Sequence, residues 1–233
     1  MSFNIEVEGG KSIRLPTAGK YCDRDIVVTA TGSGGGGDDL WQYVYSLNTC
    51  FKNAIFPEDY ELVMNLPFVA TITYLIQDAQ NLKKLTMYGG DSTVAIGGTY
   101  CFTNGTVEEI DLSNFRQGGI CFAASAKYPF YSCSRLKYIR GEIDMSLVTS
   151  SLNYFYSCGQ LVEVRFKKET IFVDLSITSA NLSDASIESI IDGLAYITGQ
   201  STKPTLTLRN SVGIKLTDAQ KARITDKGWI LAY

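Results

Sequence analysis

Acidic residues are the side chains in this sequence that could most readily do chemistry, and they occur in three clusters. The clusters are Asp38-Asp39, Glu58-Asp59-Glu61 and Glu108-Glu109-Asp111. Two neighbouring carboxylates can act as acid and base in a hydrolase, and several oxygens on one loop can bind Ca²⁺. A calcium loop also needs a turn glycine in a pattern such as DxDxDG, and no such pattern is present. We therefore interpret the clusters as solvated faces and helix N-termini.

Other catalytic and cofactor sites also lack the residues they need. The chain has no histidine, which removes histidine-activated nucleophiles, histidine acid–base catalysis and histidine-ligated metals. Its six cysteines form no CxxC pair and no metal-ligand spacing. Gly89-Gly90 and Gly97-Gly98-Thr99 are not followed by the Gly-Lys-Ser/Thr motif of a phosphate loop. We expect a protein that is not an enzyme, with no catalytic residue, metal or cofactor.

Binding is better supported than catalysis, because tyrosine and arginine dominate binding hot spots. Aromatic residues crowd the middle of the chain: Tyr88, Tyr100, Phe115, Tyr128, Tyr131, Tyr138, Tyr154 and Tyr156. We expect half or more of these rings to pack inside the fold. The others, with Arg140 and Arg165, would form an adaptable contact surface, and aromatic surfaces also suit sugar rings.

A repeat of the chain must position these side chains. The segment FYSCSRLKYI, from Phe130 to Ile139, returns as FYSCGQLVEV from Phe155 to Val164, 25 residues later. Looser copies begin at Ile76 and Cys101. A fixed period of this size indicates a solenoid, in which each unit buries its apolar edge against its neighbours.

Alignment of the four copies predicts which residues are buried. The equivalent sets are Ile76/Cys101/Phe130/Phe155, the small residues Ala79/Asn104/Cys133/Cys158, then Leu82/Val107/Leu136/Leu161 and Leu85/Ile110/Ile139/Val164. Alternation of apolar and polar positions predicts a strand with one buried face. Met87, Leu112 and Phe166 continue the pattern, but Gly141 interrupts it. The third copy starts 29 residues after the second, and we expect the extra residues to form a loop within 116–128.

The exposed columns of the same strands provide our candidate binding face. Its residues are Lys84, Glu109, Asp111, Tyr138, Arg140, Glu163 and Arg165. Stacking in parallel at roughly 4.8 Å should place Lys84 opposite Glu109, and Asp111 opposite Arg140. Each such pair is favourable by roughly 0.2–1 kcal/mol.

The repeats resemble leucine-rich repeats of the BspA-like type, over roughly Phe68 to Phe166. The quoted FYSCSRLKYI and FYSCGQLVEV segments follow that family's pattern of an aromatic residue, a Cys or Asn, and then Leu-x-x-Ile. The resemblance implies a right-handed solenoid that binds and does no chemistry. The segments IEVEGGKSIRLPTAGKYCDRDIVVTATG and LSDASIESIIDGLAYITGQ also resemble parts of phage and prophage tail-associated proteins, which implies a virion component.

These observations predict an α+β fold, a β-rich parallel solenoid with helical caps and a small N-terminal β module. We expect an anchoring and oligomerisation module at 1–31, a Gly-rich linker at 32–37, a helical N-terminal cap at 38–67, a leucine-rich-repeat-like solenoid at 68–180, and α/β rungs with a cap at 181–233. In the last part, Ser183 should cap a helix that ends at Gly199, and Thr217 with Gln220 should form a capping box.

Charge and hydropathy argue against some classes of binding partner. A net charge of −3 gives no electrostatic case for nucleic acid or an anionic membrane. No apolar run approaches the ~20 residues of a membrane span, and residues 1–6 lack the basic and apolar regions of a signal peptide. We expect a protein made in the cytoplasm. Cys133 and Cys158 should be buried neighbours that behave as small apolar thiols. The sequence does not decide whether a disulfide joins them.

Our first functional hypothesis is a phage or prophage tail-associated binding protein, such as a fibre tip or receptor-binding subunit. It would be located in the virion and would recognise a host surface glycan or protein. We expect residues 1–31 to contact other virion proteins, and we expect a homo-oligomer, with a trimer favoured. The alternative is a cellular BspA-like adhesion or interaction module, in the cytoplasm or at the bacterial surface. A polysaccharide depolymerase is a third, weaker reading.

Overall fold

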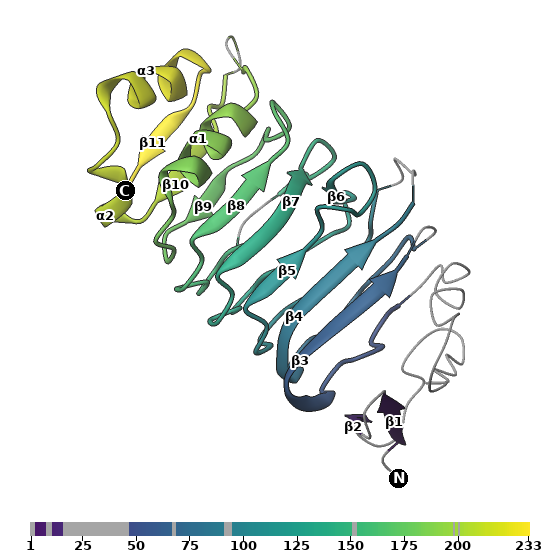
Figure 1. Ribbon diagram of the computed structural model, residues 1–233. Coiled ribbons are helices and arrows are strands. Elements are labelled where there is room, and N and C mark those ends of the chain that lie inside the picture. Colours follow the sequence, from purple (N-terminus) through teal and green to yellow (C-terminus); the bar gives the residue numbers. More distant parts are fainter. Residues whose placement is uncertain are drawn as a thin grey trace.

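The computed structural model describes residues 3–7, 11–15, 47–66, 69–90, 95–150, 153–197, 199 and 201–233. The molecule is elongated, with its strands stacked one after another between β1 at one end and β11 at the other (Figure 1). The predicted linker at 32–37, most of the predicted module at 1–31 and the first part of the helical cap, 38–46, lie outside the described residues.

A sheet of eight described strands runs along most of the molecule. Its strands are β1 Phe3–Val7, β2 Lys11–Leu15, β3 Ile55–Asn65, β4 Gln80–Tyr88, β5 Glu109–Asp111, β6 Gly119–Cys121, β7 Tyr138–Asp144 and β8 Glu163–Phe166. β1 and β2 form an antiparallel pair, and β2 meets β3 at the single pair Arg14–Ile55. From β3 onward every pairing is parallel, in the order β3, β4, β5, β7, β8.

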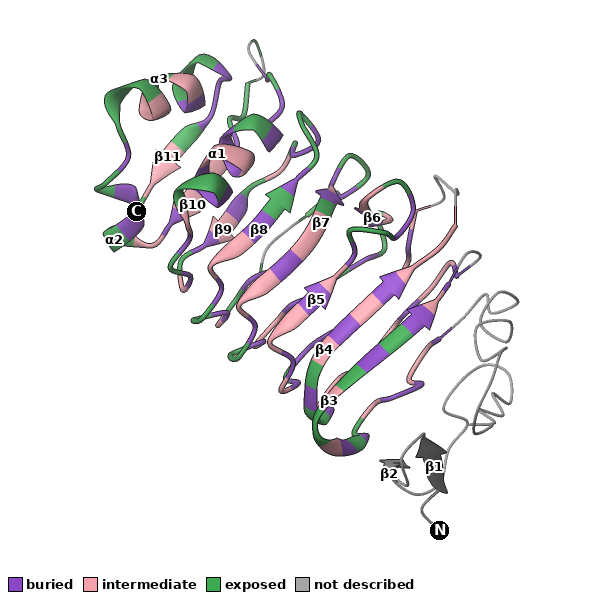
Figure 2. Ribbon diagram, in the orientation of Figure 1, coloured by how far each residue is buried: buried purple, intermediate pink, exposed green. Residues whose placement is uncertain are grey.

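The pairing of the parallel strands confirms that Lys84, Glu109, Tyr138 and Glu163 are equivalent positions of successive strands. Lys84 pairs with Glu109, Glu109 with Tyr138, and Tyr138 with Glu163. The buried neighbours Leu85, Ile110 and Ile139 are paired in the same way. Burial alternates along the strands, as Figure 2 shows on β4 and β7, because successive side chains point to opposite faces of a sheet.

A second ladder of hydrogen bonds joins the segments that lead into the strands. We call it the turn ladder and define it as residues 47–54, 71–79, 96–105, 122–133 and 153–158. In each step a backbone N–H donates to a backbone carbonyl oxygen of the next unit. The four pairs are Asn53 to Gln77, Asp78 to Thr103, Asn104 to Tyr131 and Ser132 to Tyr156. All four donors have positive φ, between 56° and 58°. The sheet and the turn ladder enclose one continuous buried core.

The turn ladder corrects the alignment of the second copy. Phe102, not Cys101, is the equivalent of Phe130, because its N–H donates to Pro129 and its ring lies 5.3 Å from that of Phe130. Gly105, and not Asn104, therefore takes the small-residue position of this unit. Asn104 instead takes a left-handed position, φ 56°, which asparagine tolerates better than most residues.

The predicted helical cap is wrong for the part that is described. Residues 47–54 form turns, and 55–65 form strand β3 rather than a helix. Leu62 and Met64 are buried at alternate positions and pair with Leu85 and Met87 of β4. The segment is thus one more unit of the stack, whose acidic and proline residues occupy an irregular stretch between Ile55 and Glu61.

The insertion before the third copy is also more ordered than a loop. β6 lies within the predicted loop 116–128 and pairs with the second half of β7, while β5 pairs with the first half. Gly141 lies between the two halves with φ 87°. The pairing of β7 with β8 shifts its register between Tyr138 and Glu142. As a result, Phe166 pairs with Ile143 and Arg165 with Glu142. Arg165 is therefore not the neighbour of Arg140 that the alignment predicted.

The C-terminal part is a smaller parallel sheet flanked by helices (Figure 1). Its elements are β9 Leu175–Ile177, α1 Asp184–Gly193, β10 Thr205–Leu208, α2 Asn210–Gly213, α3 Asp218–Asp226 and β11 Ile230–Ala232. The predicted N-cap at Ser183 and the capping box of Thr217 and Gln220 are confirmed. α1 ends at Gly193 instead of Gly199, because Leu194 is extended and bridges to Ile171. The expected class is confirmed at the level of mixed α and β structure with parallel sheets.

Candidate binding surfaces

Six of the seven predicted site residues meet on the exposed face of the sheet, which we call the strand face. Lys84 Nζ lies 2.8 Å from a carboxylate oxygen of Glu109 and 3.4 Å from one of Asp111. Arg140 forms ion pairs with Glu109, at 3.8 Å, and with Glu163. The network therefore runs without a break across β4, β5, β7 and β8.

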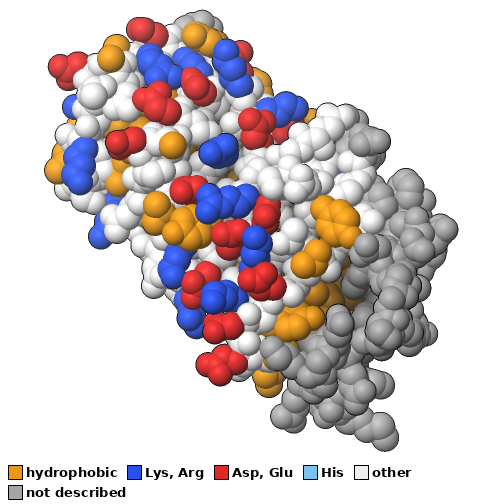
Figure 3. Space-filling model, viewed as in Figure 1, with side chains coloured by type: hydrophobic (Ala, Val, Ile, Leu, Met, Phe, Trp, Pro, Cys, Tyr) orange, Lys and Arg blue, Asp and Glu red, His pale blue; other side chains and the backbone are white. Residues whose placement is uncertain are grey.

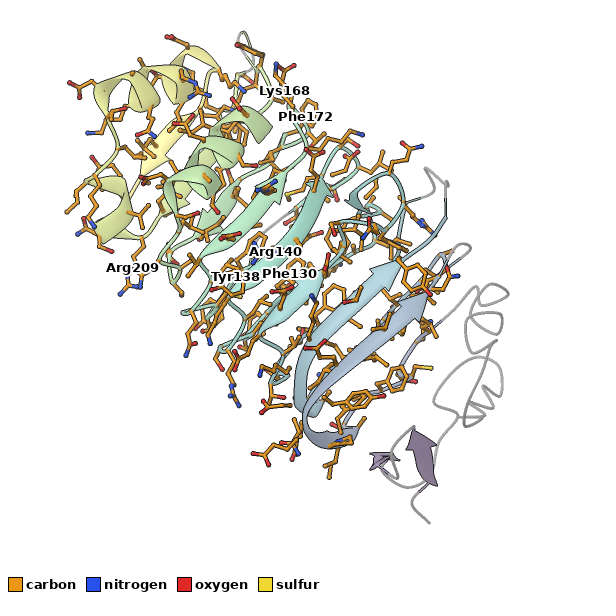
Figure 4. All side chains as sticks on the ribbon, viewed as in Figure 1. Phe130, Tyr138, Arg140, Lys168, Phe172 and Arg209 are labelled. Atoms are coloured by element: carbon orange, nitrogen blue, oxygen red, sulfur yellow. The ribbon has the colours of Figure 1, made fainter. Side chains whose placement is uncertain are left out.

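Tyr138 belongs to the same network through its ring. The guanidinium carbon of Arg140 lies 4.5 Å from the centre of the Tyr138 ring, a cation–π contact. Figure 4 shows both side chains on β7, in the middle of the sheet. The seventh predicted residue, Arg165, is exposed and stands beside Glu142 instead. The strand face is thus defined by Lys84, Glu109, Asp111, Tyr138, Arg140 and Glu163.

Charges on the strand face stabilise one another. The hydrogen bond from Lys84 to Glu109 raises the pKa of the Lys84 ammonium. Burial alone would raise the pKa of Asp111, but hydrogen bonds from the Ser113 hydroxyl and N–H, together with Lys84, lower it below its usual value. Both pKa shifts favour the charged forms of Lys84 and Asp111.

A second group of ion pairs lies beside the first. Glu108 accepts from Lys137 Nζ at 2.8 Å and from Arg135 at 3.3 Å, and its pKa is lowered chiefly by the Lys137 hydrogen bond. Lys167 pairs with Asp144 at 2.8 Å. Figure 3 shows the result: positive and negative side chains alternate over the central strands. Such a face has no field of one sign, so it suits an uncharged or mixed-charge ligand better than a polyanion.

The turn ladder carries a second candidate surface. We call it the tyrosine row: Tyr74, Tyr100, Tyr128, Tyr131 and Tyr156. Four of its five tyrosines are among the aromatic residues named from the sequence, and Tyr74 is the one that was missed. The ring centroids are 5.9 Å apart for Tyr74 and Tyr100, 5.1 Å for Tyr100 and Tyr128, and 5.0 Å for Tyr131 and Tyr156. Tyr131 meets Tyr100 and Tyr128 edge to face at 6.1 Å. The five rings therefore form one continuous cluster.

The row is polar at its rim. Lys52 Nζ lies 4.5 Å above the Tyr74 ring at one end, and Tyr156 is 51% exposed at the other. None of the five phenol hydroxyls hydrogen-bonds to another described residue. The hydroxyl of buried Tyr154, in contrast, donates to Ala126 O at 2.7 Å. A sequence signal existed, since Tyr74, Tyr100 and Tyr128 recur at 26 and 28 residues, but the 25-residue alignment separates them.

The predicted small thiols lie directly beneath this surface. Cys133 and Cys158 are buried and free, and each thiol donates to a carbonyl of the preceding unit, Phe102 O at 2.9 Å and Phe130 O at 3.0 Å. Burial raises the pKa of Cys133 well above its usual value. Both cysteines are therefore packing residues that hold neighbouring units together.

A shallow pocket of about 330 Å³ lies among the C-terminal helices. Its apolar wall is Leu182, Ile187, Val212 and Leu216, and its polar rim includes Asp184 and Lys215. The lining contains no histidine and no cysteine.

Metal sites and membrane-spanning helices are absent from the part of the chain that the structure describes. Within residues 3–7, 11–15, 47–66, 69–90, 95–150, 153–197, 199 and 201–233, no group of three or more Cys, Asp and Glu could hold a metal ion. None of the helices in those ranges is long and apolar enough to cross a membrane. Comparison of the whole chain with protein-family models, with curated proteins and with solved structures finds no match.

Proposed function

We propose that this protein is a non-catalytic, phage or prophage tail-associated binding protein, a fibre tip or receptor-binding subunit. Its parallel units would form a leucine-rich-repeat-like solenoid of the BspA-like type. The support is the regular offset between paired strands, which is 25 residues for β4–β5, 29 for β5–β7 and 25 or 23 for β7–β8. A second ladder has similar offsets, and the two ladders enclose one core. Stacked units of this kind create the extended surfaces that repeat proteins use for binding.

One observation carries the binding role: consecutive parallel strands bring six side chains from four strands onto one face. These residues are up to 79 positions apart in the chain, from Lys84 to Glu163. Tyrosine and arginine, the commonest hot-spot residues, lie at its centre as Tyr138 and Arg140. The ligand would be a host surface glycan or protein.

Residues 1–31 are the proposed contact with other virion proteins. Their described part is the small antiparallel pair β1–β2, which meets β3 at a single residue pair. A two-stranded pair buries too little to be stable alone. We propose that copies of this module assemble with one another, with a trimer favoured, and so hold the repeat region outward in a virion.

The test combines binding and oligomeric state. Tyr138→Ala with Arg140→Ala should weaken binding of the full chain to host cells or envelope fragments. Arg165→Ala is the matched control, because that arginine lies outside the ion-pair network. Deletion of residues 1–31 should convert the oligomer into a monomer, as sedimentation would show.

Other outcomes would favour the alternative or defeat the proposal. A full chain that is monomeric but binds cells would favour a cellular BspA-like adhesion module. Release of oligosaccharides from a bound polysaccharide would point to a depolymerase. Equal binding by the wild type and the double variant would remove the strand face as the binding site.

A further inference from the structure

We propose that the tyrosine row binds a neutral polysaccharide chain that runs along the stack, across successive units. The inference rests on the proposed binding function and names its ligand class and a second contact surface. The row spans the units that contain Tyr74, Tyr100, Tyr128 and Tyr156, and Lys52 continues it by one more.

The orientation of the rings decides which ligand chemistry fits. The planes of Tyr74 and Tyr100 differ by 8°, and those of Tyr131 and Tyr156 by 16°, so these rings cover one another's faces. What the row offers to solvent is ring edges and hydroxyls. A protein hot spot needs aromatic side chains buried in a dry pocket, and a row of stacked edges provides no such pocket. A ligand rich in hydroxyl groups meets the exposed groups directly.

Each phenol hydroxyl can donate one hydrogen bond and accept others. Because none of the five bonds to another described residue, each keeps its hydrogen-bonding capacity within that part of the chain. The ring centroids of stacked neighbours lie 5.0 to 5.9 Å apart, and those of the edge-to-face pair Tyr128 and Tyr131 lie 6.1 Å apart, against a strand spacing of roughly 4.8 Å. A hexose chain that runs along the row would therefore pass several phenol groups in succession.

Charge favours a neutral polymer over an acidic one. The turn ladder as defined above contains three charged residues, Lys52, Asp78 and Lys127, and these are of both signs. The residues that flank the row are mostly uncharged donors and acceptors: Thr73, Thr99, Asn104, Ser132 and Ser157. An acidic polysaccharide would need a line of lysines or arginines here, as polyanion sites do.

A repeated site also suits a repeated ligand for an energetic reason. One hydrogen bond between neutral groups contributes about 0.5–1.5 kcal/mol net. Contacts made in succession along one chain act together, because the first contact raises the effective concentration of the next. A row of individually weak hydroxyl contacts can therefore hold a polymer that a single sugar would not saturate.

The experiment is affinity electrophoresis of the full chain in gels that contain a soluble neutral β-glucan, mannan or galactan, or the polyanion alginate. The test variant is Tyr100→Phe with Tyr128→Phe and Tyr131→Phe, which keeps the stacked rings and removes three hydroxyls. Tyr196→Phe is the control, because that tyrosine is 63% exposed and lies outside the row. Melting curves of both variants should match the wild type.

We expect retardation in at least one neutral gel and none in alginate, and about tenfold or greater weakening in the triple variant. No retardation in any neutral gel would overturn the inference. So would retardation that the triple variant retains. If Tyr138→Ala with Arg140→Ala abolishes retardation while the triple variant does not, the proposed function survives and this inference fails.

A second measurement separates glycan from protein. Binding to bacterial envelopes should be lost after periodate, which cleaves vicinal diols of sugars, and kept after protease treatment. The reverse result would mean a protein ligand and would overturn the inference. Binding that survives both treatments would also contradict the inference, because an intact neutral glycan would then not be required.

Discussion

Phe130 and Phe155 lie face to face, with ring centroids 5.3 Å apart and ring planes 10° apart, although 25 residues of chain separate them. Phe102 stacks on the other side of Phe130 at the same centroid distance. The three rings are almost completely buried and stand in successive units of the turn ladder. Such aromatic pairs add roughly 0.5–1.5 kcal/mol to what burial of their area contributes, so Phe130 is the most supported ring in the stack.

Replacement of Phe130 by alanine should therefore be among the most damaging substitutions in the core. We expect a loss of about 3–5 kcal/mol in the free energy of unfolding, because a cavity remains between two rings that cannot close onto each other. Phe172→Ala is the control, since that ring is 46% exposed. Denaturant unfolding of both variants measures the difference, and equal losses would contradict the stacked arrangement.

Gly141 should not tolerate a side chain. Its φ is 87°, and a Cβ there would lie 2.7 Å from the carbonyl carbon of Leu112 and 2.9 Å from the oxygen of Gly118. Gly141→Ala should lower the free energy of unfolding by about 1–3 kcal/mol through backbone strain. Gly141 lies between the part of β7 that pairs with β5 and the part that pairs with β6, so the backbone cannot easily change there.

Gly159 provides the matched control for that substitution. A Cβ on Gly159 would meet no atom within 4 Å, so Gly159→Ala should leave the midpoint of thermal unfolding nearly unchanged. A Gly141→Ala variant as stable as Gly159→Ala would show that the chain can pass this point without the left-handed conformation.

Lys227 is a buried cation that ends helix α1. Its Nζ donates to Ile191 O, Asp192 O and Leu194 O at 2.9, 3.0 and 2.6 Å. Burial lowers the pKa of the ammonium, yet the carbonyls at a helix C-terminus favour a positive charge. Lys227→Met should cost about 1–3 kcal/mol, because three carbonyls lose their donor. Lys215→Met, at an exposed lysine, should be close to neutral in the same unfolding assay.

Glu108 should make stability depend on pH in a definite direction. The Lys137 hydrogen bond lowers the pKa of Glu108 in the folded protein, so the folded state favours the ionised carboxylate. This contribution is complete above the ordinary pKa of glutamate and is lost as pH falls through the lowered value. The wild type should exceed Glu108→Gln in stability at about pH 7, and the gap should shrink at about pH 3.

A double-mutant cycle identifies the partner of Glu108. In a Lys137→Met background, Glu108→Gln should produce a smaller pH-dependent gap, since only Arg135 then remains as an ion-pair partner. A gap of the same size at both pH values, in either background, would mean that the ion pair adds nothing to stability in solution.

Some of the strand face could be predicted from sequence because two constraints act together there. Apolar residues at alternate positions must face the core, which fixes the opposite residues as exposed. A common period then places Lys84, Glu109, Tyr138 and Glu163 in one column, and their pairing confirms it. The helix caps at Ser183 and Thr217 were predictable for a local reason, because a cap depends on side chains within a few residues.

Two of the errors share one cause, which is that the spacing between units varies without changing the hydrophobic pattern. One residue fewer after Gly105 moves Phe102 into the aromatic column, and the irregularity at Gly141 moves Arg165 away from Arg140. The helical cap over 38–67 is a different error. The spacing of Leu40, Trp41, Val44, Leu47 and Phe51 after Asp38-Asp39 suggested a helix, whereas residues 55–65 pair with strand β4.

The amino-acid sequence alone determined the period, the buried columns of the strands and the absence of histidine chemistry, because these follow from residue types and their intervals. Only the tertiary structure decided which rings stack into the tyrosine row, which charges pair across strands and where the chain bulges. Those outcomes depend on contacts between neighbouring units, and a shift of one or two residues changes the contacts while every buried position stays apolar.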